Sequence, residues 1–148
     1  MTYQVKKNIM QLVSAIFVFG IYFWYVYQQY LERNVEGVEL FRFWATAILI
    51  LIPVTIVLRL IIEIIFIIIN GIITKESAPS FSDEFDKIID LKAMRVSHFI
   101  FILGFFVAMG SLLFDSTPST MFIILLFSGF LSEAFSIVWK IFLYQRGV

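Results

Sequence analysis

The stretch from Phe41 to Ile73 constrains the fold of this chain more than any other part of the sequence. Between Arg42 and Lys75, its only ionisable residues are Arg59 and Glu63. The hydrocarbon core of a bilayer is about 30 Å thick, and a helix of about 20 apolar residues crosses it. Because backbone N–H and C=O groups in lipid must find partners within the protein, we predict that this stretch is a transmembrane helix.

The composition extends this interpretation to the whole chain. Hydrophobic residues make up 61% and charged residues 15% of the 148 residues, against about 45–50% and about 25% in a typical soluble domain. A soluble domain of this size leaves much of its surface exposed and could not cover so many apolar side chains. The sequence therefore predicts a single membrane domain over residues 1–148, surrounded by the lipid bilayer.

Three further apolar stretches also have the length of membrane spans. We predict an all-α integral membrane fold, a four-transmembrane-helix bundle in up-down-up-down order. Pro53 is expected to kink the second span, and Trp44 is expected in an aromatic belt at its outer end. Ser82 is expected to cap the third, which starts as an amphipathic cytoplasmic segment. The four spans are expected at about residues 9–30, 41–73, 83–114 and 119–144.

The basic residues predict how the chain is oriented. Only Arg33 and Arg42 lie on one side of the predicted spans, whereas eight Lys and Arg residues lie on the other. Because cytoplasmic loops carry the excess of basic residues, both termini should be cytoplasmic, in a membrane that we expect to be the bacterial cytoplasmic membrane. The eight are Lys6, Lys7, Lys75, Lys87, Lys92, Arg95, Lys140 and Arg146.

Spans two and three are longer than a bilayer requires. As single helices, residues 41–73 and 83–114 would measure about 50 and about 48 Å. We expect both to extend into the cytoplasm as a helical hairpin, in which Phe85, Ile88 and Ile89 pack on residues 64–69. The alternative is that the start of span three lies along the lipid headgroups.

Four ionisable residues, Arg59, Glu63, His98 and Glu133, are expected to meet in one layer of the bundle. Counting from the outer ends of their spans puts Arg59 and Glu133 at similar depths, about 22 and about 21 Å along the helix. One interpretation is an intramembrane polar cluster with Glu133 as the titratable group and Arg59 as its counter-charge. In the alternative, Arg59 and Glu63 pair locally or reach the interface, His98 is interfacial, and Glu133 joins helices by hydrogen bonding.

A stripe of small and polar residues follows the fourth span. Small residues allow helices in a membrane to approach closely, and hydroxyl groups can bond across the contact. Helix packing is therefore favoured over a path-lining role, and Gly104 and Ala108 form a similar pair on the third span. The stripe consists of Ser128, Gly129, Ser132 and Ser136.

Several function classes find no support in the sequence. With 11 basic and 11 acidic residues the formal net charge is zero, which gives no electrostatic basis for binding nucleic acid. There is no cysteine and one histidine, so the usual metal sites and most catalytic constellations cannot be assembled. We therefore expect no metal, no cofactor and no enzymatic activity.

The segment Asp83–Arg95 reads DEFDKIIDLKAMR. It resembles the acidic D-E-x-D…K-A-x-R stretch that precedes the third span in a group of small bacterial four-span membrane proteins of unknown function. The resemblance implies no catalytic residues. It does imply that the segment matters in its own right, as a cytoplasmic surface for a protein partner or as the cytoplasmic cap of an assembly. The residues expected on this surface are Asp83, Glu84, Asp86, Lys87, Asp90, Lys92 and Arg95.

Three functional hypotheses follow from these features. The first is a regulatory or sensory membrane subunit that binds a partner through residues 83–95. The second is a small proton-coupled exporter or ion channel that uses the intramembrane carboxylate of Glu133. The third is a purely structural or assembly role. A lone four-helix bundle has little interior in which to bury charges, so we expect a homo-oligomer or a heteromeric partner to help bury them.

Overall fold

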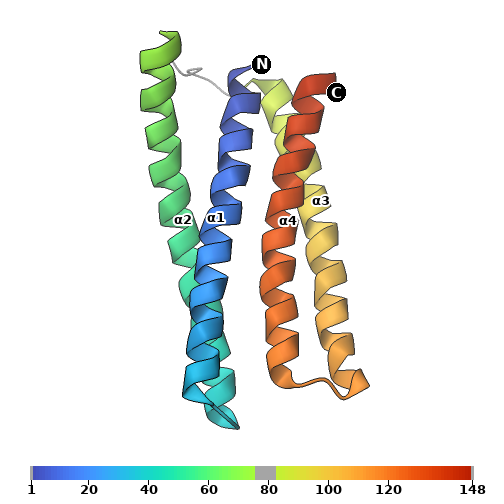
Figure 1. Ribbon diagram of the computed structural model, residues 1–148. Coiled ribbons are helices and arrows are strands. Elements are labelled where there is room, and N and C mark those ends of the chain that lie inside the picture. The colour runs from blue at the N-terminus through green and yellow to red at the C-terminus, as the bar shows by residue number, and fades with distance from the viewer. Residues whose placement is uncertain (1, 76–82, 148) are drawn as a thin grey trace.

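The computed structural model of the chain describes residues 2–75 and 83–147, which form four α-helices, one short 3₁₀ helix and no strand. Each of the four α-helices is long and apolar enough to cross a membrane, which confirms the predicted all-α class with four candidate spans. Successive helices run in opposite directions, so both termini lie at the same end of the bundle (Figure 1). The elements are α1 (Tyr3–Arg33), α2 (Val38–Thr74), α3 (Glu84–Ser111), η1 (Leu112–Phe114) and α4 (Pro118–Arg146).

Polar caps explain where three of the helices begin. The side chains of Thr2 and Thr117 each accept a hydrogen bond from a backbone N–H in the first turn of α1 and α4. Pro118 occupies the start of α4, where its missing N–H costs nothing. Asp83 caps α3 by accepting from the backbone N–H of Glu84 at 2.7 Å. The expected cap, Ser82, lies outside the described residues, and α3 begins one residue later than predicted.

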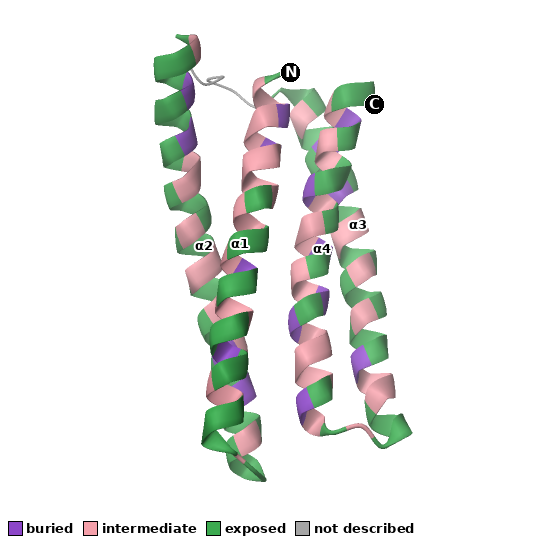
Figure 2. Cartoon of the chain, in the orientation of Figure 1, coloured by how far each residue is buried: buried purple, intermediate pink, exposed green. Residues whose placement is uncertain are grey.

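The helices differ in how closely they pack. α3 and α4 form the most extensive pair, α1 packs against both α4 and α2, and α2 and α3 do not pack along one another. Figure 1 accordingly places α1 and α4 between α2 on one side and α3 on the other. Exposed and intermediate positions predominate on all four helices and buried positions are few (Figure 2), and the most apolar part of each helix is largely unburied.

The expected contact between the second and third spans is not formed. Phe85 packs instead against Tyr144 of α4, with ring centroids 6.2 Å apart, and Ile89 is completely buried. The isoleucines in residues 64–69 of α2 are exposed, and the C-terminal half of this helix leans away from α1 (Figure 1). The prediction failed because both surfaces were simply apolar, and apolarity alone does not specify which helix a side chain will meet.

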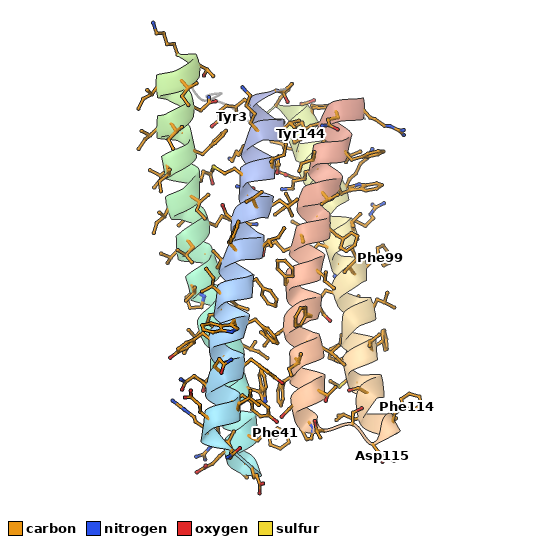
Figure 3. All side chains as sticks on the ribbon, in the orientation of Figure 1. Tyr3, Phe41, Phe99, Phe114, Asp115 and Tyr144 are labelled. Carbon is orange, nitrogen blue, oxygen red and sulfur yellow. The ribbon has the colours of Figure 1, made fainter. Side chains whose placement is uncertain are left out.

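An aromatic core fills the end of the bundle opposite the termini, the end that Phe41 and Asp115 mark in Figure 3. Its centre is Trp44, which is completely buried and donates its indole N–H to the hydroxyl of Ser119 at 3.3 Å. The prediction that Trp44 belongs to an interface belt is therefore wrong. An indole can be buried when its N–H finds a partner, and Ser119 at the start of α4 supplies it. The buried residues of this core are Phe19, Val26, Trp44, Ala47 and Leu126.

One hydrogen bond in this core provides a test of the packing of α1 on α2. The phenol of Tyr22 donates to the backbone carbonyl of Ala47. Hydrogen bonds between membrane helices contribute about 0.6 kcal/mol on average and at most about 1.7 kcal/mol. We expect Tyr22→Phe to lower the free energy of unfolding by an amount in this range, measured by SDS-induced unfolding in mixed micelles. Tyr25→Phe, at an exposed position of the same helix, is the control and should leave it unchanged.

Candidate functional site

The two deepest charges of the bundle meet across a helix interface. The guanidinium of Arg59 on α2 donates to the carboxylate of Glu133 on α4 and forms an ion pair with it. The two side chains are partly covered, with relative exposures of 48% and 35%. A charge within a membrane span is costly unless it is paired or hydrated. This arrangement supplies the first condition, since each group has a partner, and both groups line cavities.

Glu63 lies one turn further along α2 and pairs with a different helix. Its carboxylate accepts from the ammonium group of Lys7 on α1. The local pair of Arg59 with Glu63, which the sequence left open, is therefore not the arrangement found. Each of these two residues instead ties α2 to a neighbouring helix, Arg59 to α4 and Glu63 to α1. These bridges span the region in which α2 leans away from the bundle.

His98 does not join this layer. It is exposed on α3, its ring lies 6.3 Å from that of Phe99, and Phe99 points away from the bundle in Figure 3. Successive residues of a helix are rotated by about 100°, and the cavity-facing positions of this part of α3 are Met94, Ser97 and Phe101. The prediction that His98 contributes to the polar cluster is therefore wrong. The depth estimate could not decide the direction in which the side chain points.

A polar cavity of about 740 Å³ occupies the end of the bundle nearest the termini. All four helices contribute to its lining, through residues such as Asn8 of α1, Thr55 of α2, Ser97 of α3 and Ser136 of α4. Seven charged side chains also face it. These are Lys7, Arg59 and Lys140 among the cations, and Glu63, Asp86, Asp90 and Glu133 among the carboxylates.

The charges of the polar cavity do not balance. In addition to the pairs that Arg59 and Glu63 form, Lys140 pairs with Asp90 at 2.7 Å. Asp86 is left as the carboxylate without an ion pair among the described residues, and it accepts hydrogen bonds from the phenol of Tyr144 at 2.7 Å and the amide of Gln4 at 3.4 Å. With three cations and four carboxylates ionised, the lining carries one net negative charge.

A second, largely apolar cavity of about 420 Å³ continues deeper into the bundle. Its walls are mainly aliphatic and aromatic, with Val18, Leu51 and Phe101 from three different helices. Four residues line both cavities, so the polar and apolar chambers adjoin. These shared residues are Gln11, Thr55, Arg59 and Glu133. The Arg59–Glu133 pair therefore stands at the boundary between the two chambers.

The small-residue stripe of α4 divides between two faces. Ser128 and Ser132 are buried, and Ser128 lies directly against Gly104 of α3. The hydroxyls of both serines donate to carbonyls of their own helix, those of Ile124 and Gly129. Gly129 and Ser136 face the cavities instead. Two members of the stripe are thus buried, and the other two line the cavities.

The acidic segment before the third span also has two faces. Asp86 and Asp90 turn toward α4 and line the polar cavity, because they lie one helical turn apart on the same side of α3. The remaining members of the expected partner surface are exposed and line neither cavity. These are Asp83, Glu84, Lys87, Lys92 and Arg95.

Several cavity residues were not identified from the sequence, although a signal was present. On α1, Gln4, Lys7, Asn8 and Gln11 recur at intervals of three and four residues, which places polar side chains on one face of a helix. On α4, Lys140 follows Glu133 at the corresponding interval of seven. Among the described residues, no group of three His, Cys, Asp or Glu side chains is arranged to hold a metal ion.

Comparisons with protein-family models, with curated proteins and with solved structures found no match to this chain. The resemblance of residues 83–95 to a group of small four-span membrane proteins therefore stays a prediction.

Proposed function

We propose that this chain is a small proton-coupled membrane transport protein in which Glu133 is the proton-carrying group. The observation that carries this proposal is the position of the Arg59–Glu133 pair, where a polar and an apolar chamber adjoin inside a bundle of candidate membrane spans. Intramembrane carboxylates that face a cavity mark ion and proton pathways. Of the sequence-based hypotheses, the transport hypothesis is the one that the cavities favour.

The ion pair gives this carboxylate two states. When Glu133 is ionised, Arg59 is held to α4 and the leaning half of α2 is tied to the bundle. Protonation neutralises the carboxylate and removes the Coulombic attraction, which is strong where the surroundings are apolar. Arg59 is then free to move, and α2 with it. Uptake of a proton and a change in the width of the chamber are thus linked through one contact.

The orientation that we propose follows the distribution of basic residues. Both termini, and the ends of α2 and α3 that flank residues 76–82, lie on the cytoplasmic side. The polar chamber then opens toward the cytoplasm, and the apolar chamber lies deeper in the membrane. We also retain the expectation of a homo-oligomer in the bacterial cytoplasmic membrane.

Reconstitution tests the proposed activity. The purified chain is placed in liposomes with a trapped pH-sensitive dye, and an acid pulse is applied in potassium buffer with valinomycin. The pulse is applied once in this buffer alone and once with an added alkylammonium cation as a trial solute. We expect the pH gradient to collapse faster than in protein-free liposomes in at least one of these conditions. Equal rates with and without protein in both conditions would reject the proposal.

A regulatory role is the second candidate, and it rests on the exposed charges of the acidic segment. Five charged residues of this segment are exposed and line neither chamber, and charged groups of this kind can select a partner of complementary charge. Asp83→Ala/Glu84→Ala removes two of these charges, neither of which lines a cavity, together with the cap that Asp83 provides for α3. If the captured partners after mild detergent extraction are unchanged by this double substitution, the regulatory hypothesis loses its support.

A further inference from the structure

The side of the bundle between α2 and α3 suggests how a solute reaches the chambers. α1–α2, α1–α4 and α3–α4 are packed pairs, whereas α2 and α3 contribute to both chambers without packing along one another. Long side chains make the described contacts that tie the C-terminal half of α2 to the bundle. Examples are Arg59 with Glu133 and Tyr3 with Phe66. The chambers therefore have an open side that faces the acyl chains of the bilayer.

The two chambers present different chemistry in a fixed order. The polar chamber carries one net negative charge when its seven charged groups are ionised, and the surplus resides on Asp86. The deeper chamber is walled by aliphatic and aromatic side chains. A cationic head group would be attracted to the first chamber, and an apolar tail would be removed from water in the second.

The distance from Asp86 to the boundary of the apolar chamber selects for an elongated solute. Tyr144, which donates to Asp86, lies eleven residues along α4 from Glu133 at the chamber boundary, or about 16 Å at the rise of a helix. A compact cation at Asp86 would not reach the apolar walls. A cation with a long alkyl chain would reach both.

We propose that the solute of this protein is a single-chain amphipathic cation, which enters from the bilayer between α2 and α3 and places its cationic head near Asp86 and its tail in the apolar chamber. This inference rests on the proposed transport function for its biological meaning. The binding that it asserts is an equilibrium property of the bundle and requires no gradient.

The test is binding of labelled dodecyltrimethylammonium to the full chain in phosphatidylcholine nanodiscs, with empty nanodiscs to subtract partition into lipid. Saturable binding above the empty discs is expected. Unlabelled tetramethylammonium, which has the head without the tail, and dodecylphosphocholine, which has the tail without a net charge, should displace the label poorly. The proposal would be overturned if either compound displaced the label as well as unlabelled dodecyltrimethylammonium does. It would also be overturned if binding did not exceed that of empty discs.

A charge-neutralising substitution locates the head group. Asp86→Asn keeps an oxygen that can accept from Tyr144 but removes the surplus charge, and we expect about tenfold weaker binding of dodecyltrimethylammonium. Asp115→Asn is the matched control, because Asp115 is exposed in the turn at the opposite end and has a positive φ of 57°, which asparagine tolerates. Equal binding by the two variants would overturn the placement at Asp86.

The outcomes separate this inference from the proposed function. Saturable binding that depends on Asp86, without proton movement in liposomes, would support the solute class and reject proton-coupled transport. Proton movement without binding of the amphipathic cation would support transport and reject the solute class.

Discussion

Replacing Glu133 with glutamine should reduce protein-dependent proton movement to the rate of protein-free liposomes. Glutamine has nearly the same size and can still accept a hydrogen bond from Arg59, so the packing of α4 is preserved, but the side chain can no longer bind and release a proton. The measurement is the collapse of an imposed pH gradient, followed with a trapped dye at equal protein density in the membrane. If the variant retains the wild-type rate, Glu133 does not carry the proton.

Two further variants separate loss of function from loss of structure. Glu36→Gln makes the same chemical change at an exposed position between α1 and α2 and should retain the wild-type rate. Glu133→Gln leaves Arg59 without its ionic partner, which is unfavourable within a membrane span. The double variant Arg59→Gln/Glu133→Gln removes the unpaired charge, so its resistance to SDS-induced unfolding should exceed that of Glu133→Gln. If proton movement returned in the double variant, the loss in the single variant would reflect structural damage.

The fold could be anticipated largely because the membrane restricts the choices. Long apolar segments in lipid must be helices, and the turn at Asp115 and the spans on either side of it follow from local sequence. Hydropathy could not determine which helix packs on which, because lipid tails are as apolar as a neighbouring helix. The buried position of Trp44 and the packing of Phe85 on Tyr144 were missed for this reason.

For the site, the sequence predicted the depth of a side chain along its helix but not the direction in which the side chain points. Counting residues along the helices predicted similar depths for Arg59 and Glu133, and the structure brings the two together. The same argument included His98, which faces outward, because depth contains no information on rotation about the helix axis. The spacing of Gln4, Asn8 and Gln11 on α1 does contain that information, since residues three or four apart share a face. A search for polar faces on every span would have identified the polar chamber.

Replacing Gly104 with alanine should destabilise a close contact between α3 and α4. A Cβ atom at this position of α3 would lie 2.1 Å from the hydroxyl oxygen and 2.4 Å from the Cβ of Ser128 on α4. Rotating the serine side chain moves its oxygen but not its Cβ, so α3 and α4 must shift apart. We expect the free energy of unfolding in mixed micelles to fall by about 1–3 kcal/mol, the usual cost of overpacking. Gly110→Ala on the same helix meets no atom within 4 Å and should be neutral or slightly stabilising, because alanine is the better helix former.

A reciprocal substitution tests the cause of that loss. In Gly104→Ala/Ser128→Gly a methyl group is added on α3 and the hydroxymethyl group is removed from α4, so the nearest remaining atom of residue 128 is its Cα, at 3.4 Å. Because the hydroxyl of Ser128 donates only to Ile124 of its own helix among the described contacts, its removal breaks no bond between α3 and α4. The double variant should therefore recover most of the lost stability, short of about 0.5–1 kcal/mol for a glycine within α4. If the two substitutions proved merely additive, the loss would not arise from this contact.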